Sequence, residues 1–191
     1  MSTEARSSST DLPGSSADAR SLNADVPPSS AEARLAELRE AVASVPDPEI
    51  PVLTIADLGI LRDVRWATDG QPEVVITPTY SGCPATEAIR DDVLSRAHAV
   101  LPAARVVIEL APAWTTDWIT EDGRHKLAEY GIAPPGRPGP VRVQLGCRPT
   151  VACPRCGSTD TEVVSQFGST PCKALRRCRD CAEPFDEFKP L

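Results

Sequence analysis

Aromatic side chains, histidines and long apolar runs are all scarce in this chain. Aromatic residues make up 4% of its 191 residues, and only two histidines occur. No apolar stretch approaches the roughly 18 to 20 residues that a membrane-spanning helix needs. The first residues also lack the apolar centre of a secretory signal. These absences predict a cytoplasmic protein that does not bind a membrane.

The chain also lacks an excess of basic charge and several catalytic motifs. The net charge of −7 disfavours a nucleic-acid-binding protein, because that function needs a surface rich in Lys and Arg. The chain has no Glu-x-x-His pair of the di-iron bundle type. It also has neither a dinucleotide-binding glycine fingerprint nor a phosphate-binding loop. An acidic chain of this kind is predicted to bind other proteins.

The composition along the chain changes three times, which predicts four regions. Residues 1–28 are rich in Ser, Ala, Asp and Pro and are predicted to be disordered. Residues 29–133 carry the periodic apolar patterns of a folded domain. Residues 134–146 are a stiff linker rich in Pro and Gly. Residues 147–191 form a small cysteine-rich, metal-binding domain.

The folded domain is predicted to be α+β. A helix begins at the capping box of Ser29 and Glu32 and ends before Pro46. Two strands form a hairpin around a turn at Asp69 and Gly70, and two further helices and one strand complete the pattern. The predicted strands cover residues 60–66, 73–79 and 106–110, and the later helices cover residues 85–101 and 121–130. The order predicts a small three-stranded sheet with helices on one face.

Two Cys-x-x-Cys pairs near the C-terminus predict a zinc-ribbon-like knuckle. The four cysteines are Cys153, Cys156, Cys178 and Cys181. Two thiolates separated by two residues can bend round one cation, and two such turns complete a tetrahedral four-sulfur site. We expect structural zinc, although mononuclear iron or an iron–sulfur cluster would fit the same ligands. A closed site of this type leaves no open position for catalysis.

Two other cysteines lie close to the knuckle in sequence. Cys172 precedes Lys173, which can lower the pKa of the thiol. Cys172 is a possible further metal ligand, a reactive thiol or a small buried apolar group. Cys147 directly follows the linker, and its role stays open.

Cys83 is the lone cysteine of the first domain and a candidate ligand of iron or of an iron–sulfur cluster. Gly82 and Pro84 predict that it joins a strand to the start of a helix. The positive end of the helix dipole stabilises a thiolate there, which raises its reactivity and its affinity for soft metals. A buried structural cysteine is the alternative.

Two sets of side chains, one with hydroxyl groups and one with carboxyl groups, could support a ligand bound at Cys83. Thr79, Ser81 and Thr86 can hydrogen-bond a bound ligand or merely cap the helix. The carboxylates of Asp47 and Glu49, with Asp57 further on, can coordinate iron or do acid–base work, and they can equally form turns beside prolines.

The remaining candidate side chains favour packing or solvent exposure. Trp114 and Trp118 lie four residues apart, so on a helix they would share one face, and core packing is favoured over a partner-binding site. His98 and His125 are isolated and predicted to face solvent.

Several motifs resemble known families. In the first domain they are residues 45–51, 57–59 and 77–86, which look like the small domain of SufT-type iron–sulfur maturation factors. Further motifs at residues 113–118, 130–132, 166–175 and 183–186 make the chain similar to the D subunits of phenylacetyl-CoA epoxidase. The resemblance covers about residues 31–190.

The resemblance implies an accessory role in aerobic phenylacetate degradation. The multicomponent enzyme has a di-iron catalytic subunit, a structural partner and a reductase, and these are the implied partners. Cys83 matches the family cysteine that would carry iron or a cluster for the maturation of a metal centre. The alternative is a purely structural assembly subunit without metal transfer. A thiol oxidoreductase that uses Cys83 with Cys172 is disfavoured, because neither lies in a Cys-x-x-Cys redox motif.

Overall fold

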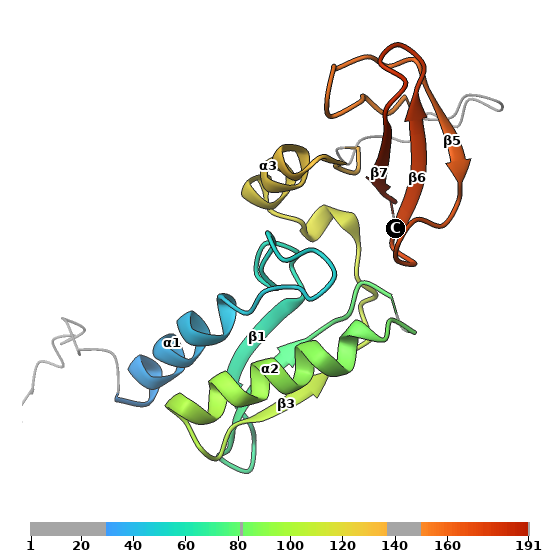
Figure 1. Cartoon of the computed structure of the whole chain (residues 1–191). Coiled ribbons are helices and arrows are strands. Elements are labelled where there is room, and N and C mark those ends of the chain that lie inside the picture. The colour runs from blue at the N-terminus through green and yellow to red at the C-terminus, as the bar shows by residue number, and fades with distance from the viewer. Residues whose placement is uncertain (1–29, 81, 137–149, 191) are drawn as a thin grey trace, which may run out of the picture.

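The computed structural model describes residues 30–80, 82–136 and 150–190 (Figure 1). The expected disordered tail and Ser29, Ser81, Cys147 and most of the expected linker lie outside these residues. The helices are α1 (Ser30–Ala43), α2 (Ala85–Val100), the 3-10 helix η1 (Thr116–Trp118) and α3 (Glu121–Tyr130). The strands are β1 (Leu61–Trp66), β2 (Pro72–Ile76), β3 (Arg105–Ile108), β4 (Ile132–Ala133), β5 (Thr161–Ser165), β6 (Lys173–Cys178) and β7 (Pro184–Phe188). No helix among the described residues has the length and apolar character to span a bilayer.

The first sheet has the order β1-β2-β3. The predicted hairpin and the predicted three-stranded sheet with helices on one face are both confirmed. Strands β1 and β2 form the expected antiparallel hairpin, and β3 runs parallel to β2. A parallel neighbour needs a crossover connection, and α2 supplies it. Helices α1 and α2 lie side by side on one side of the sheet (Figure 1). Leu38 and Val42 of α1 and Ile89 and Val93 of α2 are buried there with the apolar side chains of β2.

Ion pairs occupy the opposite face of this sheet. The nearly buried carboxylate of Glu73 accepts hydrogen bonds from the guanidinium groups of Arg65 and Arg105, at 3.2 and 2.6 Å. Asp69 and Glu109 pair with the same two arginines. A charged network replaces a packed helix here, which explains why the helices cover one face.

The two tryptophans do not share a helix face as the sequence suggested. The hydroxyl of Thr115 accepts a hydrogen bond from the Asp117 amide, so η1 starts only after Trp114. Trp114 is buried and its indole N–H donates to the Leu58 carbonyl oxygen at 2.9 Å. Trp118 is half-buried beneath the guanidinium of Arg62. Core packing is therefore confirmed for Trp114, but through a loop and not through a helix.

The C-terminal strands form a second sheet with the order β4-β7-β6-β5. Strand β4 directly follows α3, and it pairs in parallel with Asp186 and Glu187 of β7. The sheet thus includes residues 132–133, which precede the expected linker. Phe188 at the end of β7 packs in the core of the first domain, with its ring centroid 6.0 Å from that of Trp114. These contacts attach the C-terminal sheet to the first domain (Figure 1).

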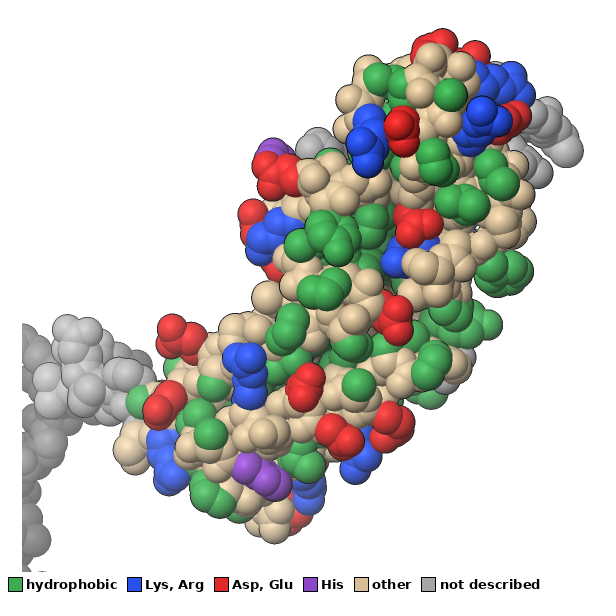
Figure 2. All heavy atoms as spheres, in the orientation of Figure 1, with side chains coloured by type: hydrophobic (Ala, Val, Ile, Leu, Met, Phe, Trp, Pro, Cys, Tyr) green, Lys and Arg blue, Asp and Glu red, His purple; other side chains and the backbone are tan. Residues whose placement is uncertain are grey.

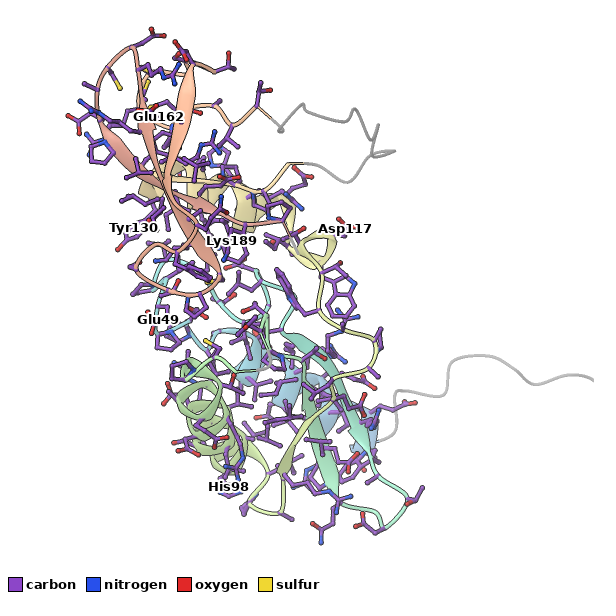
Figure 3. The ribbon with its side chains drawn as sticks, turned by 90° about the vertical axis from the view of Figure 1, so that its right-hand side faces the viewer. Glu49, His98, Asp117, Tyr130, Glu162 and Lys189 are labelled. Atoms are coloured by element: carbon purple, nitrogen blue, oxygen red, sulfur yellow. The ribbon has the colours of Figure 1, made fainter. Side chains whose placement is uncertain are left out.

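Charged side chains are mixed over the surface. On the face drawn in Figure 2, acidic and basic groups alternate without gathering into a patch of one sign. His98 and His125 are exposed, as expected. Figure 3 places His98 at the end of the molecule that is remote from the C-terminal sheet.

Candidate functional site

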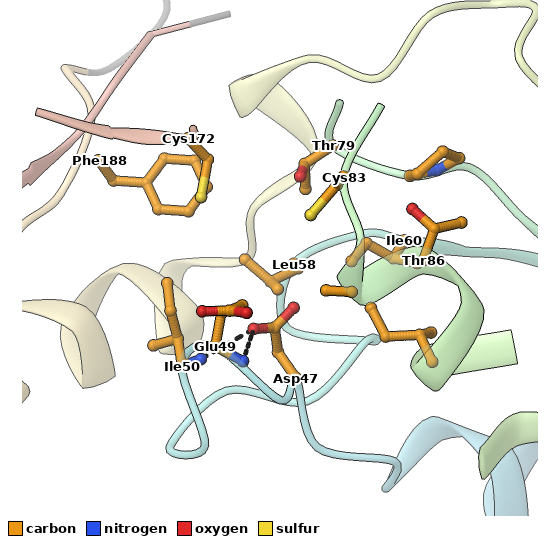
Figure 4. A pocket seen from close by; sticks show the side chains of 13 residues that line it. Asp47, Glu49, Ile50, Leu58, Ile60, Thr79, Cys83, Thr86, Cys172 and Phe188 are labelled. Atoms are coloured by element: carbon orange, nitrogen blue, oxygen red, sulfur yellow. Dashed lines mark hydrogen bonds between the residues drawn. The ribbon is translucent and has the colours of Figure 1, made fainter. Parts of the chain in front are cut away.

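A pocket lies where the first domain meets the C-terminal sheet (Figure 4). Its cavity of about 20 Å³ has room for a guest the size of one water molecule. Polar and thiol groups from three separate segments of the chain face it, and apolar side chains form the rest of the wall. The lining residues that carry chemistry are Asp47, Glu49, Thr79, Cys83, Thr86 and Cys172, and the apolar ones include Leu58, Ile60 and Phe188.

Cys83 lies immediately before α2. Its amide donates to the Tyr80 carbonyl oxygen and its own carbonyl accepts from the Thr86 amide, both at 3.1 Å. Pro84 has helical backbone angles and its side chain makes no capping hydrogen bond. The half-buried thiol of Cys83 thus lies one residue before the N-cap of a helix whose dipole favours negative charge at this end. The pocket is where that thiol points (Figure 4).

Asp47 forms the floor of the pocket from the turn after α1. The residue is only 7% exposed, and its Oδ1 accepts hydrogen bonds from the amides of Glu49 and Ile50 at 2.9 and 2.8 Å. Burial raises the pKa of this carboxyl, while the two backbone hydrogen bonds partly oppose the rise. Oδ1 therefore shapes the turn, and the other oxygen is directed toward Leu58 and Cys83 (Figure 4).

The other two carboxylates considered from the sequence behave differently. Glu49 is exposed, and Figure 3 shows it at the junction between the first domain and the C-terminal sheet. Asp57 does not line the pocket. Its carboxylate bonds the Thr54 amide at 2.9 Å and the Lys126 ammonium at 3.0 Å, which ties the turn before β1 to α3.

Cys172 enters the pocket from the loop between β5 and β6. Its carbonyl oxygen accepts a hydrogen bond from the Lys189 amide at 2.9 Å, and its sulfur lies 3.1 Å from the Thr170 hydroxyl. Burial raises the pKa of the Cys172 thiol and outweighs the lowering by the Lys173 charge that the sequence predicted. The Lys173 ammonium instead faces Asp186 at 3.6 Å. The possible further ligand of the knuckle thus lies in a different site.

Thr79 and Thr86 line the pocket, whereas Ser81 and Cys147 lie outside the described residues. Sequence reasoning missed Leu58, Ile60 and Phe188, which form the apolar wall. It paired Cys172 with Cys83 only in the disfavoured oxidoreductase hypothesis. No local pattern signals this proximity, because the two cysteines meet only through the docking of the second sheet.

The four knuckle cysteines form a second site at the other end of the C-terminal sheet. Their sulfur atoms all lie within 4.8 Å of one another. The Cys153 and Cys181 sulfurs are 3.8 Å apart, and the Cys156 and Cys178 sulfurs are 3.5 Å apart. Metal–sulfur bonds of about 2.3 Å in a tetrahedron require sulfur atoms about 3.8 Å apart. The four cysteines therefore fit one tetrahedral metal ion.

Tight turns build this arrangement. The Gly157 amide donates to the Cys153 carbonyl oxygen at 2.8 Å, and Gly157 has a φ of +75°, which a residue without Cβ adopts readily. In the second turn the Cys178 amide donates to the Glu183 carbonyl oxygen at 3.0 Å. The backbone N–H of Cys181, aimed at the Cys178 sulfur, lowers the pKa of that thiol to about 7. The pKa of Cys156 is instead raised to about 12, because the backbone hydrogen bond from Ser158 is outweighed by the hydrogen bond with Cys178 and by the desolvation of the sulfur. The Cys178 thiol loses its proton easily, as metal binding requires.

Comparison with known proteins assigns both parts of the chain. Residues 35–109 match the family model described as an iron-sulfur cluster assembly protein. Residues 137–189 match the model described as a PaaD zinc beta ribbon domain.

Two proteins named Fe-S protein maturation auxiliary factor are similar to the first part. The one from Porphyromonas gingivalis is 36% identical over 86 residues, which cover 44% of this chain and 81% of that protein. The factor YitW of Bacillus subtilis is 39% identical over 80 residues, which cover 40% of this chain and 76% of that protein. Among solved structures, a domain of unknown function, DUF59, from Bacillus anthracis matches 51% of this chain and 94% of its own. Its TM-score is 0.46 at 26% identity, so this likeness adds nothing to the assignment.

One relative matches most of the chain. The Escherichia coli (strain K12) protein named as the D subunit of "Putative 1,2-phenylacetyl-CoA epoxidase" is 49% identical over 157 residues. The alignment covers 80% of this chain and 91% of that protein. The chain therefore belongs to the family of the 1,2-phenylacetyl-CoA epoxidase D subunit, in which an iron–sulfur assembly domain is followed by a zinc beta ribbon.

Proposed function

We propose that this protein is a non-catalytic accessory subunit of a phenylacetyl-CoA epoxidase system that assists maturation of an iron or iron–sulfur centre. Its partners are the other subunits of that enzyme, with the di-iron or reductase component as the recipient of the metal. Cys83 is the transient ligand of the iron or cluster. Asp47, Glu49, Thr79, Ser81 and Thr86 support the ligand, and the ribbon holds structural zinc.

The observation that carries the proposal is the pocket around Cys83. It combines a half-buried thiol at a helix start with a buried carboxylate and two hydroxyl groups. Soft thiolate and hard carboxylate donors together suit iron. The match of this domain to an iron–sulfur assembly family, and the names of two relatives as maturation factors, support the same function.

Zinc is the metal we infer for the ribbon. Four sulfur ligands at tetrahedral separations suit zinc, and a full ligand set leaves no position for a substrate. The four cysteines come from two turns of a small sheet that has few buried apolar side chains beside its cysteines. The ion therefore supplies much of the folding free energy of the ribbon.

A purely structural assembly subunit is the second candidate. It is favoured by one observation, the firm attachment of the ribbon to the first domain through Phe188 and the β4–β7 pairing. In that case both sites serve only to hold the shape of a docking protein. Disruption of the ribbon would then abolish complex formation, whereas Cys83→Ser would have no effect.

The test is metal and acid-labile sulfide analysis of protein purified without oxygen. Wild type is compared with Cys83→Ser and with Tyr80→Phe, a control at an exposed neighbour of the same turn. One zinc per chain in all three proteins, with iron or sulfide lost only in Cys83→Ser, is the expected result. Zinc alone in all three, even after anaerobic reconstitution with iron and sulfide, would favour the assembly function.

The same variants are then tested in cells. A strain that lacks the chain is complemented with each variant, and the epoxidase is isolated for iron analysis. Cys83→Ser is expected to lower the iron content and activity of the enzyme, while Tyr80→Phe restores both. Full metallation of the enzyme in cells that carry Cys83→Ser would refute metal delivery through Cys83.

A further inference from the structure

Each turn of the four-cysteine group contributes one buried and one exposed cysteine. Cys153 and Cys178 are buried, whereas Cys156 and Cys181 are exposed. Strand β6 ends at Cys178, at the end of the C-terminal sheet that is remote from α2 (Figure 1). Cysteine oxidation follows thiolate character and exposure, so an exposed ligand sulfur meets oxidants that a buried one does not. The ribbon thus places an accessible sulfur beside a protected one.

We propose that Cys156 and Cys178 form an oxidation site, at which a hydroperoxide makes a disulfide, expels the ribbon metal and loosens the wall of the Cys83 pocket. The oxidation site itself goes beyond the proposed function. Its consequence for iron rests on that function, because that function assigns iron to the pocket.

The positions of the sulfur atoms select this pair. The Cys156 and Cys178 sulfurs are 3.5 Å apart and belong to different turns. Cys156 is exposed to a small oxidant, whereas Cys178 has an exposed fraction of 0% and is shielded from it. Oxidation of Cys156 therefore creates an electrophilic sulfur next to a second thiolate. The Cys153 and Cys181 sulfurs are 3.8 Å apart and make up the competing pair.

Contacts between the two turns keep them opposed without the metal. The Ser158 hydroxyl donates to the Asp180 carboxylate. The Arg179 amide donates to the Asp160 carbonyl oxygen at 2.9 Å. A disulfide has its two sulfurs about 2.05 Å apart, so the side chains need only a small approach to form one. The turns therefore stay in place while the disulfide forms.

One molecule of hydrogen peroxide balances the reaction. A bound metal keeps both sulfurs as thiolates, whatever their pKa in the metal-free chain. The Cys156 thiolate attacks a peroxide oxygen, the O–O bond breaks, and a sulfenic acid and hydroxide form. The Cys178 thiolate then attacks the sulfenic sulfur and displaces a second hydroxide. Solvent protonates both hydroxides to water. Each sulfur has given up one electron, and the metal has lost two anionic ligands.

Loss of the metal removes much of what orders the ribbon. Its buried apolar cluster consists of Ala133, Cys153, Cys178 and Phe185, with Val151 packed against it. Two of these four buried residues are metal ligands, so little apolar packing remains once the ion has left. Strand β6 ends at Cys178 and begins directly after Cys172, which lines the pocket. Oxidation of the ribbon therefore reaches the Cys83 pocket through one strand.

The simpler alternative is that the ribbon sulfurs are inert once they bind the ion. Buried structural cysteines react poorly, and a closed ligand set limits access to them. On that basis hydrogen peroxide would modify Cys83 or Cys172 and leave the zinc in place. The alternatives therefore differ in which cysteine is oxidised and in whether zinc is released.

The experiment uses the full chain loaded with Zn²⁺ and treated with hydrogen peroxide beside a zinc-sensitive dye. The unaltered chain is compared with Cys83→Ser, a control whose ribbon is unchanged. Dimedone, which traps sulfenic acids, is added to parallel samples, and adducts and disulfides are mapped by mass spectrometry. Both proteins are expected to release about one zinc for each disulfide formed. Dimedone should mark Cys156, and the disulfide should join Cys156 to Cys178.

Each outcome has a defined meaning. Retained zinc with dimedone on Cys83 or Cys172 would overturn the oxidation site. A disulfide between Cys153 and Cys181, or within one turn, would overturn the assigned pair. Zinc release from the unaltered chain but not from Cys83→Ser would place the first oxidation in the pocket and overturn the inference. Equal release from both, with no iron bound at Cys83 in the metal analysis, would refute the proposed function and leave the oxidation site standing.

The reactivity of Cys172 tests the link to the pocket and needs no variant. Peroxide-treated and untreated chains are alkylated with iodoacetamide, and modification of Cys172 is followed by mass spectrometry. The rate is expected to rise several-fold when zinc is released, because local opening exposes the thiol. A dithiol reductant with added Zn²⁺ should restore the lower rate. An unchanged rate after complete zinc release would overturn the link between the ribbon and the pocket.

Discussion

Replacement of Gly59 by alanine tests how the apolar wall of the pocket is held. Gly59 has a φ of +67°, and a Cβ there would lie 2.5 Å from the Trp118 carbonyl oxygen and 2.6 Å from its Cβ. A left-handed backbone costs an L-residue about 1–2 kcal/mol. Overpacking against atoms that must move adds about 1–3 kcal/mol. Gly59→Ala is therefore expected to lower the free energy of unfolding by about 2–5 kcal/mol.

Gly70 is the matched control. It has a φ of +79° in the β1–β2 turn, but a Cβ there would meet nothing within 4 Å. Gly70→Ala should therefore show only the backbone cost, and the change in the unfolded chain is shared by both variants. The difference between the two variants isolates the collision, at about 1–3 kcal/mol.

Urea unfolding followed by tryptophan fluorescence measures both stabilities. The slope with urea should be the same for both variants, so that the midpoints report stability alone. Gly59 follows Leu58, which lines the pocket and accepts the Trp114 hydrogen bond. Gly59→Ala should therefore also weaken the iron binding proposed for Cys83, whereas Gly70→Ala should not. Equal destabilisation by the two substitutions would refute the argument that close packing against Trp118 fixes this turn.

Two further predictions concern the metal and the pH dependence. Removal of the ribbon metal with a strong chelator should abolish the hydrogen-exchange protection of β5, β6 and β7, while α1 and α2 keep theirs. Added Zn²⁺ should restore the protection. Protection of β6 that survives metal removal would contradict a metal-dependent ribbon. For Asp57, burial alone raises the pKa, but hydrogen bonds from Thr54 and Lys126 outweigh it, so that the pKa is lowered from 3.8. The stability from these bonds is present above pH 3.8 and is lost as the pH falls through the lowered value. Asp57→Asn should therefore lower the free energy of unfolding by about 1–3 kcal/mol at pH 7 and by progressively less in acid. Urea unfolding measures this loss, and an equal loss at about pH 7 and about pH 2.5 would contradict the assignment.

The fold of the first domain was largely predictable because its signals are local. Proline positions, helical periodicity and the Asp69–Gly70 turn each act over a few residues, and α1, α2, β1 and β2 formed where these signals lie. The prediction that Trp114 and Trp118 share a helix face was wrong because it, too, used only local spacing. A spacing of four residues predicts a helix face only if a helix is present, and the Thr115 side chain starts η1 one residue too late for Trp114.

The sites divide in the same way. A Cys-x-x-Cys pair is a local turn, so the sequence could indicate the four-cysteine group before any tertiary contact was known. The meeting of Cys83 and Cys172 depends on β4 pairing with β7 and on Phe188 entering the core of the first domain. Strand β4 has only two residues and Phe188 is a single aromatic side chain, so neither shows a periodicity that predicts such docking.

Strand β6 connects the four-cysteine group with the pocket around Cys83. It begins at Lys173, the residue after Cys172, and ends at Cys178, a member of the four-cysteine group. A strand of this length spans roughly 17–20 Å at about 3.3 Å per residue. Its position is fixed at one end by the knuckle and along one side by β7. An ion in the knuckle therefore orders the strand that presents Cys172 to the pocket. A metal ion in the ribbon would then affect the pocket around Cys83, because loss of that ion would release Cys172 from the pocket wall.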